Sequence, residues 1–464
     1  MENKKVKNIP FISSFCKFFV NFHKRFKDGS LGTKISHFVL GVGNVMHKQY
    51  VKGALYFVLQ VLFILFMILC PEVNSTPFGY KAIANFFTLG TVEGTVFTEG
   101  DNSMLMLLFG VITFGIIAIY FFLWNSAIKS SYKADLDVRE EKQPTTFKED
   151  LKSLLDDRFH ILMLTPTCLA AVIFTILPTI YMIFIAFTNF DKLHPSPSVL
   201  LDWVGFENFT NIFTGNGEIA ERFVPVLGWT IVWAIFATFT NYFGGILLAL
   251  LINKKEVKLK KLWRTVFIFT IALPQFISLL AVRNLLGELG PVNNMLQTVG
   301  ILKEPMAFLG NADNAMTARI TILVVNLWIG VPYTMLQTSG ILMNIPSDLY
   351  EAATIDGANK NQMFFNITLP YIIFVTTPYL ISSFVGNINS FNVIYLLSGG
   401  GPVVPGNIAG KTDLLVTWLY KLTIDEGDYN LGAVIGILTF LITSTITLLT
   451  YRRSKAYNEE DTFQ

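Results

Sequence analysis

Long apolar segments separated by short polar ones dominate the chain, and this pattern restricts its fold more than any other feature. A bilayer-spanning helix needs about 20 consecutive, mainly apolar residues. Charged residues make up 15% of the 464 residues, whereas soluble proteins average about 25%. We therefore expect an all-α membrane protein with about eight transmembrane helices. The candidate segments lie near 53–71, 104–124, 161–188, 226–252, 264–286, 318–342, 368–396 and 431–451.

Prolines and a glycine interrupt two of these segments. Pro274 divides the segment 264–286, and Pro378 and Gly386 lie within 368–396. A membrane helix tolerates such residues where neighbouring helices satisfy the freed backbone groups. We therefore predict local breaks at these positions.

The basic residues predict how the chain is oriented. Cytoplasmic loops of membrane proteins are enriched in Lys and Arg. Placing residue 1 inside puts most of the 35 basic residues on the cytoplasmic side, including those of 24–27, 125–160, 254–261 and 452–453. We predict that both termini are cytoplasmic.

Charge and hydropathy divide the chain into five parts. We expect the basic, amphipathic N-terminal part to lie as a helix on the cytoplasmic lipid surface. The linker has mixed charges and suits a solvated connector to a six-helix core. The parts are an N-terminal region at 1–52, two additional membrane helices at 53–124, a cytoplasmic linker at 125–160, the core at 161–453 and a cytoplasmic tail at 454–464.

A polar stretch, "YEAATIDGANKNQMFFNITLP", separates the sixth and seventh segments at 350–370. Pro346 and Asp348 suit the start of a helix, since Pro fits the first turn and Asp favours the positive end of the dipole. Gly357 suits a C-terminal cap. The stretch is either an ordinary cytoplasmic loop helix or a low-profile helix that another protein approaches closely.

Its residues resemble the "EAA" signature of ABC importer permeases. The matching positions are Glu351, Ala352, Ala353, Asp356 and Gly357, followed by Ile367 and Leu369-Pro370. In that family a coupling loop, here about 344–367, docks into a cleft of the ATP-hydrolysing subunit. The resemblance covers about 160–453. It includes "NLWIGVPYTMLQTSGILMNIPSDLYEAATIDGA" and "LLSGGGPVVPGNIAGKTDLLVTWLY" and is closest to the larger membrane subunit of maltose and maltodextrin importers.

Two segments carry polar residues at helical spacing. Asn326, Gly330 and Tyr333 share one helix face, as do Ser383, Asn387 and Ser390, with Gly386 beside them. Amides and hydroxyls complement sugar hydroxyls, and a tyrosine ring stacks on a pyranose. The same groups also suit interhelical hydrogen bonds and close helix packing, and the pattern alone leaves both interpretations open.

The resemblance favours the sugar site. In maltose permeases the matching helices line that site, and Asn326, Gly330, Tyr333, Ser383 and Asn387 match the family residues. Three positions depart from it. Ile329 replaces a leucine, Gly386 replaces a stacking phenylalanine and Ser390 replaces an asparagine. The resemblance therefore implies an oligosaccharide, while the lost aromatic group leaves the sugar itself open.

The sequence offers no catalytic or metal site of its own. "PGNIAGKT" at 405–412 approaches a phosphate-binding loop, but its first glycine is replaced by Pro405 and no strand is expected before it. The resemblance implies that the chain binds no cofactor and that ATP–Mg is held by a partner ATPase. The other implied partners are a second related permease, an extracellular sugar-binding protein and membrane lipid, with no nucleic acid. It also implies a multi-pass protein of the bacterial cell membrane.

Two other functions remain to be weighed. A secondary sugar transporter would work without an ATPase. However, no Asp, Glu or His occupies the middle of a predicted span, as proton relays usually require. A membrane enzyme acting on lipid-linked sugars would need carboxylates or basic clusters arranged near a membrane face.

Overall fold

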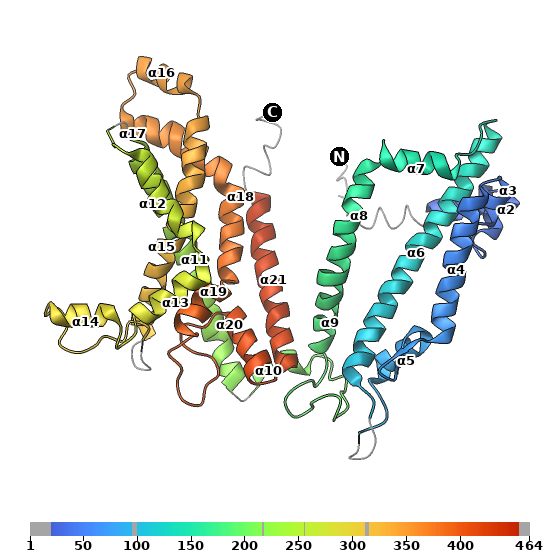
Figure 1. Cartoon of the computed structure of the whole chain (residues 1–464), viewed down its shortest axis with the longest axis horizontal. Helices are drawn as coiled ribbons and strands as arrows, with labels where there is room; N and C mark the ends of the chain where they lie inside the picture. The colour runs from blue at the N-terminus through green and yellow to red at the C-terminus, as the bar shows by residue number, and fades with distance from the viewer. Residues whose placement is uncertain (1–19, 95–99, 216–217, 255, 311–314, 454–464) are drawn as a thin grey trace, which may run out of the picture. The chain divides into compact units, whose positions relative to one another are not determined.

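The computed structural model describes residues 20–94, 100–215, 218–254, 256–310 and 315–453, and it is mostly helical (Figure 1). Residues 1–19 of the predicted N-terminal region and the predicted cytoplasmic tail at 454–464 lie outside the described residues. The chain separates into two compact units, residues 1–203 and 204–464. Each unit is described by itself below.

Unit 1 contains three long apolar helices and several short elements. Residues 20–28 are helical. The further elements are α2 (Leu31–Ile35), α3 (Val42–Met46), α4 (Tyr50–Leu69), the antiparallel strands β1 (Glu72–Val73) and β2 (Thr76–Pro77), α5 (Gly79–Thr88), α6 (Ser103–Arg139), α7 (Phe147–Leu155), α8 (Phe159–Ala171), the π-helical turn η1 (Val172–Ile176) and α9 (Leu177–Ile185).

Unit 2 contains the remaining apolar helices and the polar stretch. Its elements are α10 (Glu207–Thr214), α11 (Glu218–Asn253), α12 (Lys260–Ala272), α13 (Gln275–Leu285), α14 (Pro291–Thr298), α15 (Ala315–Asn344), α16 (Ser347–Ile355), α17 (Lys360–Met363), η2 (Phe364–Thr368), α18 (Leu369–Ile388), α19 (Phe391–Ser398), α20 (Leu415–Tyr420), η3 (Lys421–Asp425) and α21 (Tyr429–Arg453).

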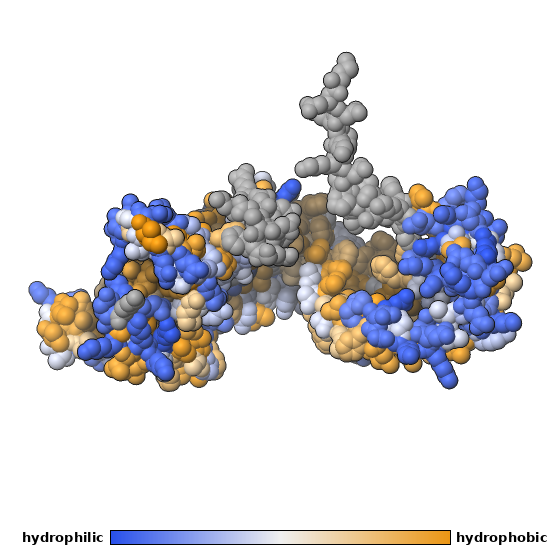
Figure 2. Space-filling view, turned by 90° about the horizontal axis from the view of Figure 1, so that it is seen from above, coloured by the Kyte–Doolittle hydropathy of each residue, from blue (hydrophilic) through white to orange (hydrophobic). Residues whose placement is uncertain are grey.

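The membrane prediction is confirmed. Seven helices of the described chain are long and apolar enough to cross a bilayer, and the bent pair α12–α13 makes up to eight. Apolar side chains accordingly lie at the molecular surface (Figure 2). A soluble fold would bury such side chains, whereas a lipid-facing surface leaves them outside.

The predicted break at Pro274 is present, and the two helices on either side of it meet at 92°. The prediction for the seventh segment was wrong. One regular helix, α18, runs through Pro378 and Gly386, and the chain breaks only at Asn389 and Ser390. A proline removes one helical hydrogen bond, and a membrane helix tolerates that loss because its other backbone groups still require internal partners.

The described part of the N-terminal region packs against the long helix α6. It also carries exposed apolar residues. The hydroxyls of Thr33 and Ser131 lie 3.2 Å apart, and the Asn44 amide donates to Ser130 at 2.9 Å. These contacts fix α2 and α3 against α6, which continues into the predicted linker as far as Arg139. Lipid contact by this region stays a prediction.

The third span packs against the second additional helix within unit 1, where α9 contacts α6. The Tyr181 hydroxyl lies 3.5 Å from the Met104 carbonyl oxygen. The assignment of the third span to the six-helix core stays a prediction.

Close packing of α11 against α15 organises unit 2. A Cβ atom on Gly245 would collide with the Thr334 side chain, and one on Gly330 would collide with Asn241. A Cβ on Gly244 would approach Val331 to 2.9 Å. Small residues allow membrane helices to approach closely and gain van der Waals contact. These glycines therefore set the distance between the two helices.

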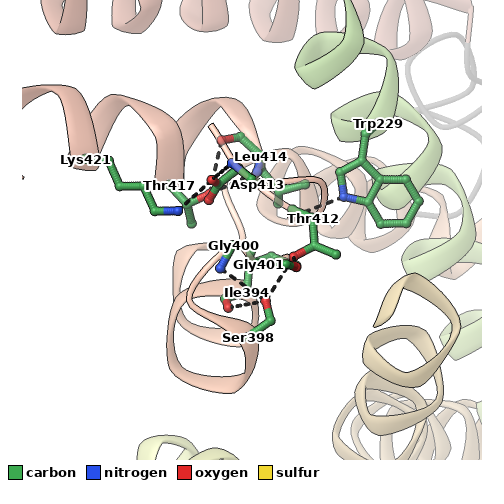
Figure 3. A network of polar contacts seen from close by, with 11 residues as sticks. Trp229, Ile394, Ser398, Gly400, Gly401, Thr412, Asp413, Leu414, Thr417 and Lys421 are labelled. Atoms are coloured by element: carbon green, nitrogen blue, oxygen red, sulfur yellow. Dashed lines mark hydrogen bonds and ion pairs between the residues drawn. The ribbon is translucent and has the colours of Figure 1, made fainter. Parts of the chain in front are cut away.

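A buried carboxylate organises the chain between α19 and α21 (Figure 3). Asp413 is 1% exposed, and its carboxylate lies 2.7 Å from the Lys421 ammonium and accepts from the Gly410 N–H at 2.7 Å. Thr417 donates to the other oxygen at 2.8 Å. Burial raises the pKa of the Asp413 carboxyl, while Lys421 and these hydrogen bonds act in the opposite direction.

The residues just before Asp413 are tied to both α11 and α15. The Trp229 indole donates to the Thr412 carbonyl at 3.1 Å, and the Arg319 guanidinium donates to the Lys411 carbonyl at 2.9 Å. The glycine-containing loop therefore has a structural role in the fold. Its resemblance to a phosphate-binding loop is superficial, because no strand leads into it.

The glycine packing yields a stability prediction. Gly245→Ala places a methyl group against Thr334 in a tightly packed interface, and overpacking costs about 1–3 kcal/mol. Gly228→Ala in the same helix meets no atom within 4 Å and serves as the control. We expect thermal unfolding of the purified protein to occur at a lower temperature for Gly245→Ala only. Equal melting temperatures for both variants would contradict this role.

Candidate functional site

A cavity of about 570 Å³ lies among the helices of unit 2. One wall is α15, the opposite lining comes from α18 and the first turns of α19, and α11 contributes a single residue. The remaining wall is the bend between α12 and α13. The cavity therefore draws on segments that lie far apart in the sequence.

All eight residues predicted as substrate contacts line this one cavity. Helical periodicity explains the grouping, because residues three, four and seven apart face the same side of a helix. From α15 come Asn326, Ile329, Gly330 and Tyr333, and from α18 and the break after it come Ser383, Gly386, Asn387 and Ser390.

The two asparagines differ in whether their side-chain amides have hydrogen-bond partners. The Asn387 side-chain amide donates to the Thr238 hydroxyl at 2.9 Å, and the backbone carbonyl of Asn387 accepts from the Trp233 indole at 3.1 Å. Asn326 is 5% exposed, and its amide nitrogen has no hydrogen-bond partner among the described residues. Asn387 thus serves helix packing in part, whereas Asn326 retains an unused donor at the cavity wall.

The two predicted glycines also differ in their surroundings. Gly330 packs against Asn241, so its missing side chain serves the approach of α11 to α15. Gly386 has no atom within 4 Å of the position where a Cβ would lie. Only Gly386 therefore leaves open space in the cavity.

Sequence reasoning missed several lining residues, of which Tyr379 is the largest. Its ring centroid lies 6.0 Å from that of Tyr333, and its hydroxyl lies 3.2 Å from the Thr334 hydroxyl. Tyr379 precedes Ser383 by one helical turn, so the face already identified on α18 could have revealed it. The others are Asn241, Thr270, Ile271, Ala272, Leu273, Pro274, Gln275, Ser278 and Val393.

The described residues lining the cavity include no Asp, Glu, His, Lys or Arg. Its polar groups are amides and hydroxyls, accompanied by two tyrosine rings. Such a lining binds neutral polar molecules by hydrogen bonds and ring stacking. Its described residues offer no charged side chain to an ionic ligand.

The residues predicted to dock an ATPase lie on α16 and directly after it. Glu351, Ala352, Asp356 and Gly357 are exposed, and Ala353 is partly exposed. Gly357 has φ +79°, a left-handed conformation that favours glycine at a helix end. The predicted cap is therefore confirmed.

Among the described residues of unit 2, one side-chain contact ties α16 to a neighbouring element, and the rest of the helix is largely exposed. It has no buried residue, and Ile355 is 86% exposed. The Tyr350 hydroxyl lies 2.8 Å from the Thr368 hydroxyl at the start of α18. Figure 1 shows α16 at the end of α15, beside α17. The cavity and this exposed helix thus share α15 and α18 as supports.

Comparison with known proteins decides the family. Residues 241–456 match the sequence model described as the binding-protein-dependent transport system inner membrane component. A galactooligosaccharides transport system permease protein, GanP of Bacillus subtilis (strain 168), is 35% identical over 90% of this chain and 96% of its own length. The chain belongs to this permease family.

Other relatives extend the comparison. The maltodextrin transport system permease protein MalC of Streptococcus pneumoniae is 34% identical over 91% of this chain and 95% of its own. The maltose/maltodextrin permease protein MalF of Escherichia coli (strain K12) is 36% identical over 57% of this chain and 51% of its own. A solved bacterial ABC transporter involved in alginate import has 25% identity and a TM-score of 0.52, covering 66% of this chain and 98% of that one. The expected permease fold is confirmed.

The cavity predicts a difference in chemical accessibility along α18. Gly386→Cys points its thiol into open space, whereas Ile388 is 2% exposed. In a permease whose native cysteines are replaced by serine, we expect a charged methanethiosulfonate reagent to modify Gly386→Cys much faster than Ile388→Cys. Mass spectrometry after timed quenching measures both rates. Similar rates at the two positions would show that the cavity is closed to water.

Proposed function

We propose that this permease is the transmembrane subunit of an ATP-driven ABC importer of neutral oligosaccharides of the maltodextrin class. ATP hydrolysis on a separate subunit drives alternating access of the cavity between α15 and α18. The chain itself carries no ATPase site, and ATP–Mg binds to the partner ATPase. The relatives named as maltodextrin and galactooligosaccharide permeases support this substrate class.

One observation carries the proposal: all eight residues predicted to contact sugar line a single uncharged cavity. Sugars bind through hydroxyls that donate and accept hydrogen bonds and through ring faces that stack on aromatic groups. The amides, hydroxyls and paired tyrosine rings of the cavity provide both. A neutral sugar fits this lining better than an acidic polysaccharide, which would favour basic side chains.

The exposed helix α16 supports coupling to an ATPase. A partner with a concave surface can cover Ile355 and the small residues Ala352 and Ala353. Forces on α16 pass directly into α15 and, through Tyr350 and Thr368, into α18. Both of these helices line the cavity, so movement of α16 changes the cavity walls.

The complete transporter contains further subunits in this proposal. Two ATPase subunits offer two docking clefts, and this chain supplies one docking helix, so a second related permease completes the assembly. An extracellular binding protein delivers the sugar. In this proposal both termini lie on the cytoplasmic side of the bacterial cell membrane, and the distribution of basic clusters supports that orientation.

Two alternatives fit the cavity less well. A proton-coupled secondary transporter needs a titratable acid or histidine on its pathway, and the described lining residues include none. A membrane enzyme acting on lipid-linked sugars needs groups that move protons or stabilise charge. The described lining residues include no charged side chain for that purpose. Reconstitution with and without an ABC ATPase separates these functions, because only the importer depends on the ATPase.

The sugar site predicts unequal effects of two substitutions. Ser383→Ala removes one neutral hydrogen bond, worth roughly 0.5–1.5 kcal/mol. Tyr333→Ala also removes an aromatic surface that is half exposed, so it should reduce uptake more. Uptake of labelled maltotriose by cells carrying each variant measures the difference, with complex assembly and basal ATP hydrolysis as controls. Normal uptake by Tyr333→Ala would exclude the cavity as the sugar site.

The docking role predicts a loss of coupling. Gly357→Pro is incompatible with φ +79°, and Ala353→Asp places a charge on the contact face. We expect both variants to reach the membrane but to lose transport and sugar-stimulated ATP hydrolysis, whereas Ala353→Ser stays active. Pull-down of the ATPase measures docking directly. Wild-type stimulation in both damaging variants would rule out α16 as the docking helix.

A further inference from the structure

The bend between α12 and α13 forms a wall of the cavity. The helical spacing of polar residues in the sequence does not reveal this wall. Residues 270–275 and Ser278 line the cavity there, and the two helix axes turn by 92°. Most of this wall is the bend itself, where backbone groups as well as side chains are available to the cavity.

Several backbone groups at this bend lack partners. Pro274 has no N–H, so the Thr270 carbonyl loses its usual helical donor. Among the described residues, no backbone hydrogen bond outside the helices ends on the Thr270, Ile271 or Ala272 carbonyl oxygens. The Ile277 N–H donates to the Pro274 carbonyl at 3.0 Å, whereas the N–H groups of Gln275 and Phe276 precede any intrahelical acceptor. Acceptors and donors therefore lie close together within an apolar segment.

The side chains of the bend add two further polar groups. Ser278 is 8% exposed, and its hydroxyl has no hydrogen-bond partner among the described residues. Gln275 is exposed and lines the same cavity. An unpartnered buried hydroxyl is costly unless a ligand or water satisfies it.

We infer that the α12–α13 bend is a third binding wall for the sugar, with Gln275 and Ser278 as additional specificity-determining residues. This inference rests on the proposed sugar transport. Sugar hydroxyls both donate and accept, so they can satisfy the free carbonyls of α12 together with the Ser278 hydroxyl and the Gln275 amide. Discontinuous membrane helices bind substrates through their free ends in the same way.

The wall also explains how one ligand is held from several sides. Asn326 offers an unused donor from α15, and Gly386 leaves space beside α18. The bend supplies hydrogen bonds from another element, so a sugar unit can be contacted by amide, hydroxyl and backbone groups at once. Discrimination among oligosaccharides then depends on Gln275 and Ser278 as well as on the two helix faces.

The test uses the complete reconstituted transporter with saturating binding protein and labelled maltotriose. Each lost hydrogen bond corresponds to roughly a 2–10-fold effect, so Ser278→Ala and Gln275→Leu should each reduce the uptake rate by that factor. Assembly of the complete complex is verified for each variant before uptake is measured. Phe276→Leu is the matched control, because Phe276 is exposed on the same helix and does not line the cavity.

Three results would overturn the inference. Normal uptake by Ser278→Ala and Gln275→Leu, with reduced uptake by Tyr333→Ala, would remove the bend from the site and leave the proposed function intact. Normal uptake by all three would reject the cavity itself. Uptake that requires Na⁺ in the unmodified protein, and loses that requirement in Ser278→Ala, would assign the free carbonyls to a cation instead.

Discussion

The close approach of α11 and α15 is the interaction on which unit 2 depends. Gly244, Gly245 and Gly330 bring the two helices together at positions where a side chain would collide. Because lipid tails are as apolar as the helices, such packing must supply stability that the hydrophobic effect gives to soluble proteins. The same contact fixes the face of α15 that carries Asn326 and Tyr333 toward the cavity.

Polar anchors at the two ends of this helix pair complement the apolar packing. At one end, Trp229 and Arg319 bind the backbone next to Asp413. Beyond the other end of α15, Tyr350 joins α16 to the start of α18. The cavity lies between these anchored ends. In the proposed importer, a helix that is fixed at its ends and packed along one side transmits a displacement of α16 to the cavity with little internal deformation.

Much of this arrangement follows from the sequence, because helical periodicity is a local property. The spacing of Asn326, Gly330 and Tyr333 places them on one face whatever the neighbouring helices do. The contribution of Ser278 could not be predicted in this way, because a 92° bend ends the periodic relation between α12 and α13. Pro378 misled the sequence interpretation, since one lost hydrogen bond does not break a helix in lipid.

Contacts between side chains on different elements could not be predicted from the sequence either. Asp413 and Lys421 lie at opposite ends of α20, and the Gly410 N–H and the contact of Thr412 with Trp229 of α11 hold Asp413 in place. Asn241 lies in an apolar segment, and only the approach of α15 places it beside Gly330. Sequence patterns thus identify the faces of individual helices, whereas the assembled packing determines which faces enclose a cavity.

The most direct test of this account is an electron cryo-microscopy structure of the complete transporter, trapped with an ATPase-inactive partner and an oligosaccharide. The account predicts sugar density between α15 and α18, in contact with Tyr333 and filling the space at Gly386, and α16 seated on the ATPase. Sugar bound elsewhere, with Asn326 and Tyr333 packed against neighbouring helices, would contradict it.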